Sequence, residues 1–180
     1  MSDIAKARLA FPLATESIGE FVSKPFVRSD DHNLYEWAKD DPMANWERRF
    51  MPEEHYSKIA SFRVSHYERY SFGVLGLWQH QGHVEHLVGQ WGLQVFDPIK
   101  DEVEAVVFLS REFVGRGIGS FLFRAILERS ANAGLVTVLG VVREDNAVAL
   151  RLMQRLGGVE KGRATHFGFP SIIYRFSLDN

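Results

Sequence analysis

Apolar residues follow two different spacings along the chain, and each change of spacing marks a predicted element. Residues 103–109 (VEAVVFL) form an apolar run of strand length. After a polar turn, apolar residues recur at intervals of three and four, which is typical of a helix with one apolar face. These residues are Ile118, Phe121, Leu122, Ala125 and Ile126. The pattern predicts a strand, a glycine loop at 114–120 and a helix in direct succession.

The same patterns predict further strands and helices on both sides of this segment. Residues 70–79 and 84–96 read as an antiparallel hairpin around the turn at 80–83, and 103–109 pairs back as its third strand. Further strands are predicted over 19–27, 135–142, 159–167 and 171–178. Helices are predicted from Ser29, from Pro52 toward Tyr70 and over 147–156. Residues 1–15 lack clear periodicity and are predicted to be a loose N-terminal arm.

Three glycines stand where the predicted strand gives way to the helix, in VGRGIGS at 114–120. A helix leaves its first N–H groups without internal acceptors, and its dipole adds partial positive charge there. Glycine permits positive φ and keeps a Cβ out of the path of an approaching anion. The segment is therefore a candidate site for a phosphate or diphosphate.

Two common phosphate loops do not fit this segment. A Walker loop ends in Gly-Lys-Ser/Thr, and this loop has no Lys. A dinucleotide fold needs an acidic residue about 20 residues further on and several more βα units, and neither is present. At this point a loop for the diphosphate of coenzyme A and a glycine turn without any ligand both remain open.

A second motif, REDNAVALRLMQRLGG at 143–158, follows the next predicted strand. Together with VGRGIGSFLF at 114–123 it resembles the GNAT superfamily of acetyl-CoA-dependent N-acetyltransferases, most of all the type that acetylates ribosomal-protein N-termini. The resemblance implies an α/β (α+β) fold: a mixed, mostly antiparallel central sheet of about six to seven strands, flanked by helices, with splayed central parallel strands. The sequence departs from the family pattern at Val114, where the family has Arg or Gln, at Met153, where it often has Tyr, and at Gly158, where Phe is common.

The resemblance also implies where acetyl-CoA would bind. The pantetheine arm would pair with backbone groups at Phe108, Leu109 and Ser110. The diphosphate would lie on the amides of Val114, Gly115, Arg116, Gly117, Ile118, Gly119 and Ser120. Asn146 would bind the arm or hold the opening between the strands, although Asn is equally suited to cap the following helix. Met153 occupies a further position of the implied cofactor site.

Amine acetylation needs a base, because an ammonium group has no lone pair with which to attack a thioester. Glu104 is the predicted base, since acetyltransferases of the ribosomal-protein type commonly carry Glu on this strand. The alternative is a charged residue at a strand end. Tyr174, on the last strand, is the candidate acid in place of the Tyr that is absent at 153, and its alternative is a core aromatic. The chain has no cysteine for an acyl-enzyme, which favours direct attack in a ternary complex.

Composition and net charge bear on the number of domains and on the kinds of partner that the protein can bind. The chain has 180 residues, of which 46% are hydrophobic and 24% charged, which predicts one soluble globular domain over 1–180. A net charge of −2 gives no electrostatic case for nucleic acid or a membrane, and without an apolar run of about 20 residues we expect a cytoplasmic protein. No acidic or cysteine ligand accompanies His80, His83 and His86 at a recognised spacing, so no metal site is predicted.

The sequence leaves the acceptor open among a protein N-terminus, a lysine and a small-molecule amine. Two alternatives to acetyl transfer also remain: a non-catalytic CoA-binding module, and transfer of a longer acyl group. The resemblance further implies a possible homodimer through the final strands.

Overall fold

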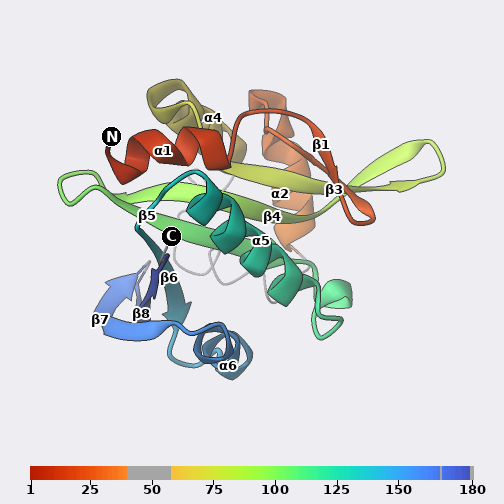
Figure 1. Ribbon diagram of the computed structural model, residues 1–180. Helices are drawn as coiled ribbons and strands as arrows, with labels where there is room; N and C mark the ends of the chain where they lie inside the picture. Colours follow the sequence, from red (N-terminus) through yellow and green to blue (C-terminus); the bar gives the residue numbers. More distant parts are fainter. Residues whose placement is uncertain (40–57, 167, 179–180) are drawn as a thin grey trace.

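A computed structural model describes residues 1–39, 58–166 and 168–178, and one sheet runs through these ranges (Figure 1). The sheet has eight strands in the order β1-β2-β3-β4-β5-β6-β8-β7. Their bounds are β1 (Glu16–Ile18), β2 (Phe21–Lys24), β3 (Val74–Gln81), β4 (Val84–Asp97), β5 (Glu102–Leu109), β6 (Thr137–Arg143), β7 (Val159–His166) and β8 (Phe169–Ser177). Among the described strands only β5 and β6 are parallel neighbours.

This arrangement confirms the predicted mixed, mostly antiparallel sheet with central parallel strands. It has more strands than predicted, because the predicted strand over 19–27 is replaced by a short hairpin. Gly19 takes a φ of +59° and turns the chain between β1 and β2.

The helices lie on both faces of the sheet (Figure 1). Their bounds are α1 (Asp3–Ala10), α2 (Asp31–Lys39), α4 (Ile59–Tyr70), α5 (Ile118–Asn132) and α6 (Ala147–Arg155), with single 3₁₀ turns η1 (Arg28–Asp30) and η2 (Arg111–Phe113). The helix start predicted at Pro52 lies outside the described residues, and α4 corresponds to the later part of that prediction. None of the helices described is both long and apolar enough to cross a membrane.

Side chains that alternate along β4 separate the two faces. Trp91 points toward α1 and α5, and its ring centroid lies 5.0 Å from that of Phe11. Gln94, three residues later, points toward α4. The larger apolar core lies on the α1 and α5 face, and a smaller core forms under α2 and α4 from Phe26, Leu34, Ile59, Ala60, Tyr67 and Trp78.

The prediction of a loose N-terminal arm is wrong, because Asp3–Ala10 forms α1 against the sheet. Ala7 and Phe11 are fully buried and Ala10 is nearly so. The helix was not recognised in the sequence because its buried side within Asp3–Ala10 consists of small alanines, which make no apolar stripe.

Two carboxylates tie α1 to the sheet. Asp101, in the turn between β4 and β5, accepts the N–H groups of Asp3 and Ile4 at 2.6 and 3.0 Å. The Asp3 carboxylate in turn accepts the N–H groups of Val136 and Thr137 at 3.2 and 3.3 Å. Helix α1 therefore links the β4–β5 turn to the start of β6.

Candidate functional site

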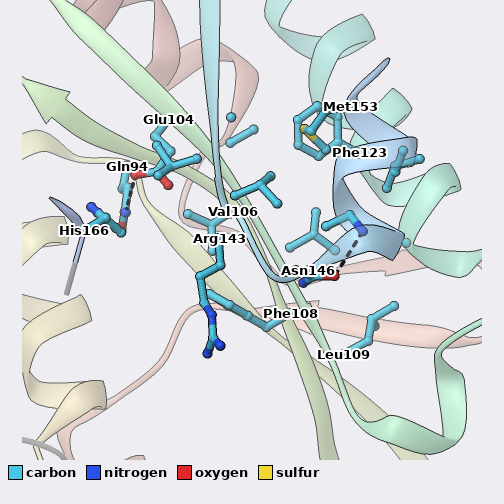
Figure 2. Close-up of a pocket in the computed structure, with 18 of the residues that line it drawn as sticks. Gln94, Glu104, Val106, Phe108, Leu109, Phe123, Arg143, Asn146, Met153 and His166 are labelled. Carbon is cyan, nitrogen blue, oxygen red and sulfur yellow. Dashed lines mark hydrogen bonds between the residues drawn. The ribbon is translucent and has the colours of Figure 1, made fainter. Parts of the chain in front are cut away.

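A cavity opens where β5 and β6 part. The two strands share one register pair, Glu104 with Leu139, and then diverge. Lining residues from both strands, 104–109 and 140–143, border a cavity of about 1390 Å³. In Figure 2, Glu104 and Gln94 lie on one side of this cavity and Asn146 and Met153 on the other.

Two groups of lining residues face each other across the cavity. We call the lining residues within 113–120 and 145–155 the loop side, and those within 58–66 and 94–96, together with Glu104, the α4 side.

The loop side is built mainly from backbone. Gly115 and Gly117 both have a φ of +82°, and a Cβ placed on either would meet no atom within 4 Å. Helix α5 begins directly after Gly117, and its first internal hydrogen bond runs from the Phe121 N–H to the Gly117 carbonyl at 3.0 Å. The N–H groups that precede Phe121 in this 15-residue helix have no acceptor within the helix, and Gly119 and Ser120 line the cavity. The segment therefore fits a diphosphate.

Not every predicted loop residue takes part in this surface. The Val114 N–H donates to the Arg111 carbonyl at 3.1 Å, so this amide is engaged within the protein, although Val114 still lines the cavity. The Arg116 guanidinium lies 5.2 Å from the Phe113 ring centroid and 3.8 Å from the Glu20 carboxylate. Ile118 packs against the main core. Among the described lining residues are Gly115, Gly117, Gly119 and Ser120, but neither Arg116 nor Ile118.

Phe108 and Leu109 line the cavity, whereas Ser110 does not belong to the described lining. The Ser110 N–H and hydroxyl both donate to the Val88 carbonyl, at 2.8 and 3.0 Å. Its hydroxyl also accepts the Trp37 indole N–H at 2.6 Å. Ser110 therefore anchors the end of β5 to β4 and α2, and its amide is not available to a bound ligand.

Asn146 caps the following helix, one of the two roles that the sequence left open, and its contact with the pantetheine arm stays a prediction. Its Oδ1 caps α6 by accepting the Ala149 N–H at 3.1 Å, and the residue lines the cavity. Figure 2 shows its amide nitrogen pointing away from that bond, toward the cavity. Asp145 pairs instead with Arg143, and the hydrogen bond from this guanidinium lowers the pKa of the Asp145 carboxyl.

Met153 is buried at the wall of the loop side. A Cβ placed on Gly140 would come within 2.9 Å of the Met153 sulfur, so the glycine makes room for the thioether. A thioether carries no proton to donate. Met153 therefore shapes the cavity but cannot act as a general acid.

Tyr174, the predicted acid, lies in the core. It is 3% exposed, pairs with Gly140 across β8 and β6, and is not among the described residues that line the cavity. The packing matches the alternative of a core aromatic, and we do not retain Tyr174 in the chemistry proposed below.

The α4 side is built from side chains. Glu104 is 5% exposed, and its Oε2 accepts the Gln94 Nε2 at 2.9 Å (Figure 2). The Gln94 Oε1 accepts the Arg63 Nη1 at 2.6 Å, and Arg63 is 6% exposed. Neither Arg63 nor Gln94 is among the site residues predicted from the sequence. The signal for Gln94 is that it is a polar residue within an apolar stretch, and Gln90 shares that property.

Two histidines also line the cavity, and burial lowers the pKa of both. For His66, which also lies near Arg63 and Arg69, the pKa falls to about 4. A neutral His66 donates from Nδ1 to the Phe72 carbonyl at 2.9 Å and accepts the Val95 N–H at Nε2 at 3.1 Å. His66 thus holds α4 to β4, while His166 lies on the same side of the cavity as Gln94 (Figure 2).

The histidines of the β3–β4 hairpin lie elsewhere. His83 and His86 are exposed, and His80 lies 3.6 Å from the Glu85 carboxylate. Within the part of the chain that the structure describes, no three His, Asp or Glu side chains gather closely enough to hold a metal ion.

In a comparison with protein families, residues 32–158 match the model of the acetyltransferase (GNAT) family. A search among curated proteins returns no match.

Solved structures of similar fold are numerous. A protein described as a GnaT-family acetyltransferase from Bordetella pertussis has a TM-score of 0.70 at 19% identity, over 91% of this chain and 99% of that one. The RimL ribosomal L7/L12 alpha-N-protein acetyltransferase, solved with coenzyme A, has 0.71 at 14%, over 92% and 99%. The microcin C7 self-immunity acetyltransferase MccE, solved with acetyl-CoA and AMP, has 0.69 at 13%, over 89% and 93%. At these identities the likeness establishes the fold alone.

Proposed function

This chain belongs to the GNAT family of acetyltransferases, and from that premise we propose that it transfers an acetyl group from acetyl-CoA to a primary amine in a ternary complex. The observation that carries the proposal is the cavity between β5 and β6, with an open glycine loop on one side and a buried carboxylate on the other. Two proteins of similar fold solved with coenzyme A or acetyl-CoA support the choice of donor.

The loop side would bind the donor. The amides at the start of α5, beside Gly115 and Gly117, would hold the diphosphate, and the Asn146 amide nitrogen would contact the pantetheine arm. Phe108 and Leu109 border the channel along which this arm would lie. Acetyl-CoA supplies the activated acetyl thioester when it is bound.

Glu104 would act as the general base. Its carboxylate lines the cavity at the register pair that β5 and β6 share, just before the two strands part, and it is nearly excluded from solvent. There it would take the proton of the acceptor ammonium, directly or through water, so that the free amine can attack the thioester carbonyl. The chain has no cysteine, which favours this direct transfer over a Cys acyl-enzyme.

The test is the Glu104→Gln variant, assayed by thiol release from acetyl-CoA against a panel of primary amines. We expect kcat to fall about 100-fold or more, the scale of general-base catalysis, while the calorimetric affinity for CoA stays within about twofold. Glu102→Gln is the matched control: Glu102 lies two residues earlier on β5, pairs with Lys161 and does not belong to the described lining. Full turnover in Glu104→Gln would remove Glu104 from the mechanism.

A second candidate function is a CoA-binding module without turnover. It is favoured by the buried thioether of Met153, which can donate no proton to a departing thiolate. The same assay separates the two: a wild-type protein that binds CoA but acetylates no amine in the panel would support the module.

A further inference from the structure

Gln94 joins the buried Arg63 to the buried Glu104. It stands directly opposite Glu104 in the β4–β5 register, and cross-strand neighbours of this kind bring their side chains into contact. Its Oε1 accepts from Arg63 at 2.6 Å and its Nε2 donates to Glu104 at 2.9 Å. All three residues line the cavity.

The chemistry of the three groups allows the Gln94 amide one orientation. A guanidinium can only donate hydrogen bonds, so the oxygen of the amide must face Arg63. The nitrogen is then directed at Glu104 and donates to Oε2. An ionised carboxylate only accepts, so this nitrogen matches the form of Glu104 that can take a proton.

We propose that Gln94 is a positioning residue, which holds the Glu104 carboxylate in its ionised form and in a fixed orientation for proton removal, with Arg63 fixing the amide from behind. The inference rests on the proposed function, because it takes Glu104 to be the base. The geometry assigns Oε2 to Gln94, so the amide restrains how the carboxylate is turned toward the acceptor.

Other residue types at position 94 would not serve this role. Leu would remove a hydrogen-bond donor from a carboxylate that is 5% exposed, which favours the protonated acid. Glu would accept from Arg63 but would set a second carboxylate against Glu104, so that one of the two would bind a proton. An amide is the side chain that satisfies both neighbours at once.

The experiment compares Gln94→Leu with wild type over a range of pH. We expect kcat to fall about tenfold or more and the acid limb of the kcat/KM profile to move up by about one pH unit, while CoA affinity stays within about twofold. In the double variant with Glu104→Gln, the two losses should not add, since both act through one carboxylate. An unchanged kcat and acid limb in Gln94→Leu would overturn the inference.

Gln90→Leu is the matched control. Gln90 lies four residues earlier on β4, is 2% exposed, does not belong to the described lining, and its buried Oε1 has no partner among the described residues. The same substitution there removes an amide of equal size from the same strand, and we expect it to leave the pH profile in place.

A titration without any acceptor gives a second readout. The ¹³C resonance of the Glu104 carboxyl, identified by its loss in Glu104→Gln, should titrate about one pH unit higher in Gln94→Leu than in wild type. An unshifted titration would contradict the positioning role.

If Glu104→Gln is inactive and Gln94→Leu fully active, the positioning inference alone fails. If Glu104→Gln is fully active, the assignment of the base fails, and the inference fails with it.

Discussion

The two sides of the cavity differ in the groups that form them: backbone groups on one side and side chains on the other. The loop side rests mainly on backbone amides and two left-handed glycines within 113–120, and Asn146 and Met153 add to it from the second segment. The α4 side rests on side chains that come from α4, β4 and β5. A surface of backbone amides depends little on which side chains surround it, whereas a chain of side-chain hydrogen bonds depends on every member.

The substitution expected to weaken CoA binding at the loop side most is a β-branched residue at Gly117. In Gly117→Val, we expect CoA affinity to fall about 100-fold, because a valine disfavours the φ of +82° and displaces amides that would each bond a charged oxygen. Isothermal titration with CoA measures the loss.

Gly162→Val is the control for that variant. Gly162 lies on β7, has no left-handed φ, and a Cβ there would meet no atom within 4 Å. An affinity in Gly117→Val within about threefold of the control would show that the loop does not carry the diphosphate.

The contrast also explains what the sequence could predict. The loop side is local: the glycines and the helical period of 118–126 stand together in the chain, so the strand, the loop and α5 were predicted close to their observed bounds. Ser110 was mispredicted because its partners, Val88 and Trp37, lie far from it in sequence.

The α4 side could not be predicted in the same way. Arg63 and Gln94 lie 31 residues apart, and Gln94 meets Glu104 only through the register of β4 and β5. A polar residue in an apolar strand does not by itself reveal which neighbour it bonds. Tyr174 shows the converse difficulty, because burial of its ring depends on packing that periodicity does not encode.

A fall in pH should destabilise the α4 side before it destabilises the loop side. The pKa of His66 is lowered to about 4, below its usual 6.5, so the folded state favours the neutral ring. Its contribution to stability is complete above pH 6.5 and is lost as the pH falls toward 4. Allowing for partial exposure, we expect a loss of about 2 kcal/mol.

Thermal unfolding of His66→Phe against wild type measures this effect. Phe keeps an aromatic ring against Tyr70 and Phe72 but does not titrate. Between pH 7 and 4 we expect the wild-type midpoint to fall about 4–8 °C further than that of the variant. Parallel curves for the two proteins would exclude His66 as the source of acid sensitivity.

Replacing Asn146 has the smallest expected effect. This residue belongs to the loop side, but it acts through its side chain rather than its backbone. Asn146→Ala should lower the free energy of unfolding by about 1 kcal/mol through loss of the α6 cap, whereas Asn146→Ser should keep most of it. If the amide nitrogen contacts the bound donor, both variants should lose CoA affinity equally, by about threefold. Urea unfolding and CoA titration of the pair separate the cap from the contact, and equal stability of the two variants would refute the cap.

Helix α1 has a consequence for the order in which the contacts of the fold can form. The Asp3 carboxylate accepts the N–H groups of Val136 and Thr137, which lie 133 and 134 residues further along the chain. Bringing together residues so far apart in sequence has a high entropic cost, unless the elements between them have already folded. We therefore expect Asp3 to bind the start of β6 late in folding, after the sheet that places the two segments side by side has formed.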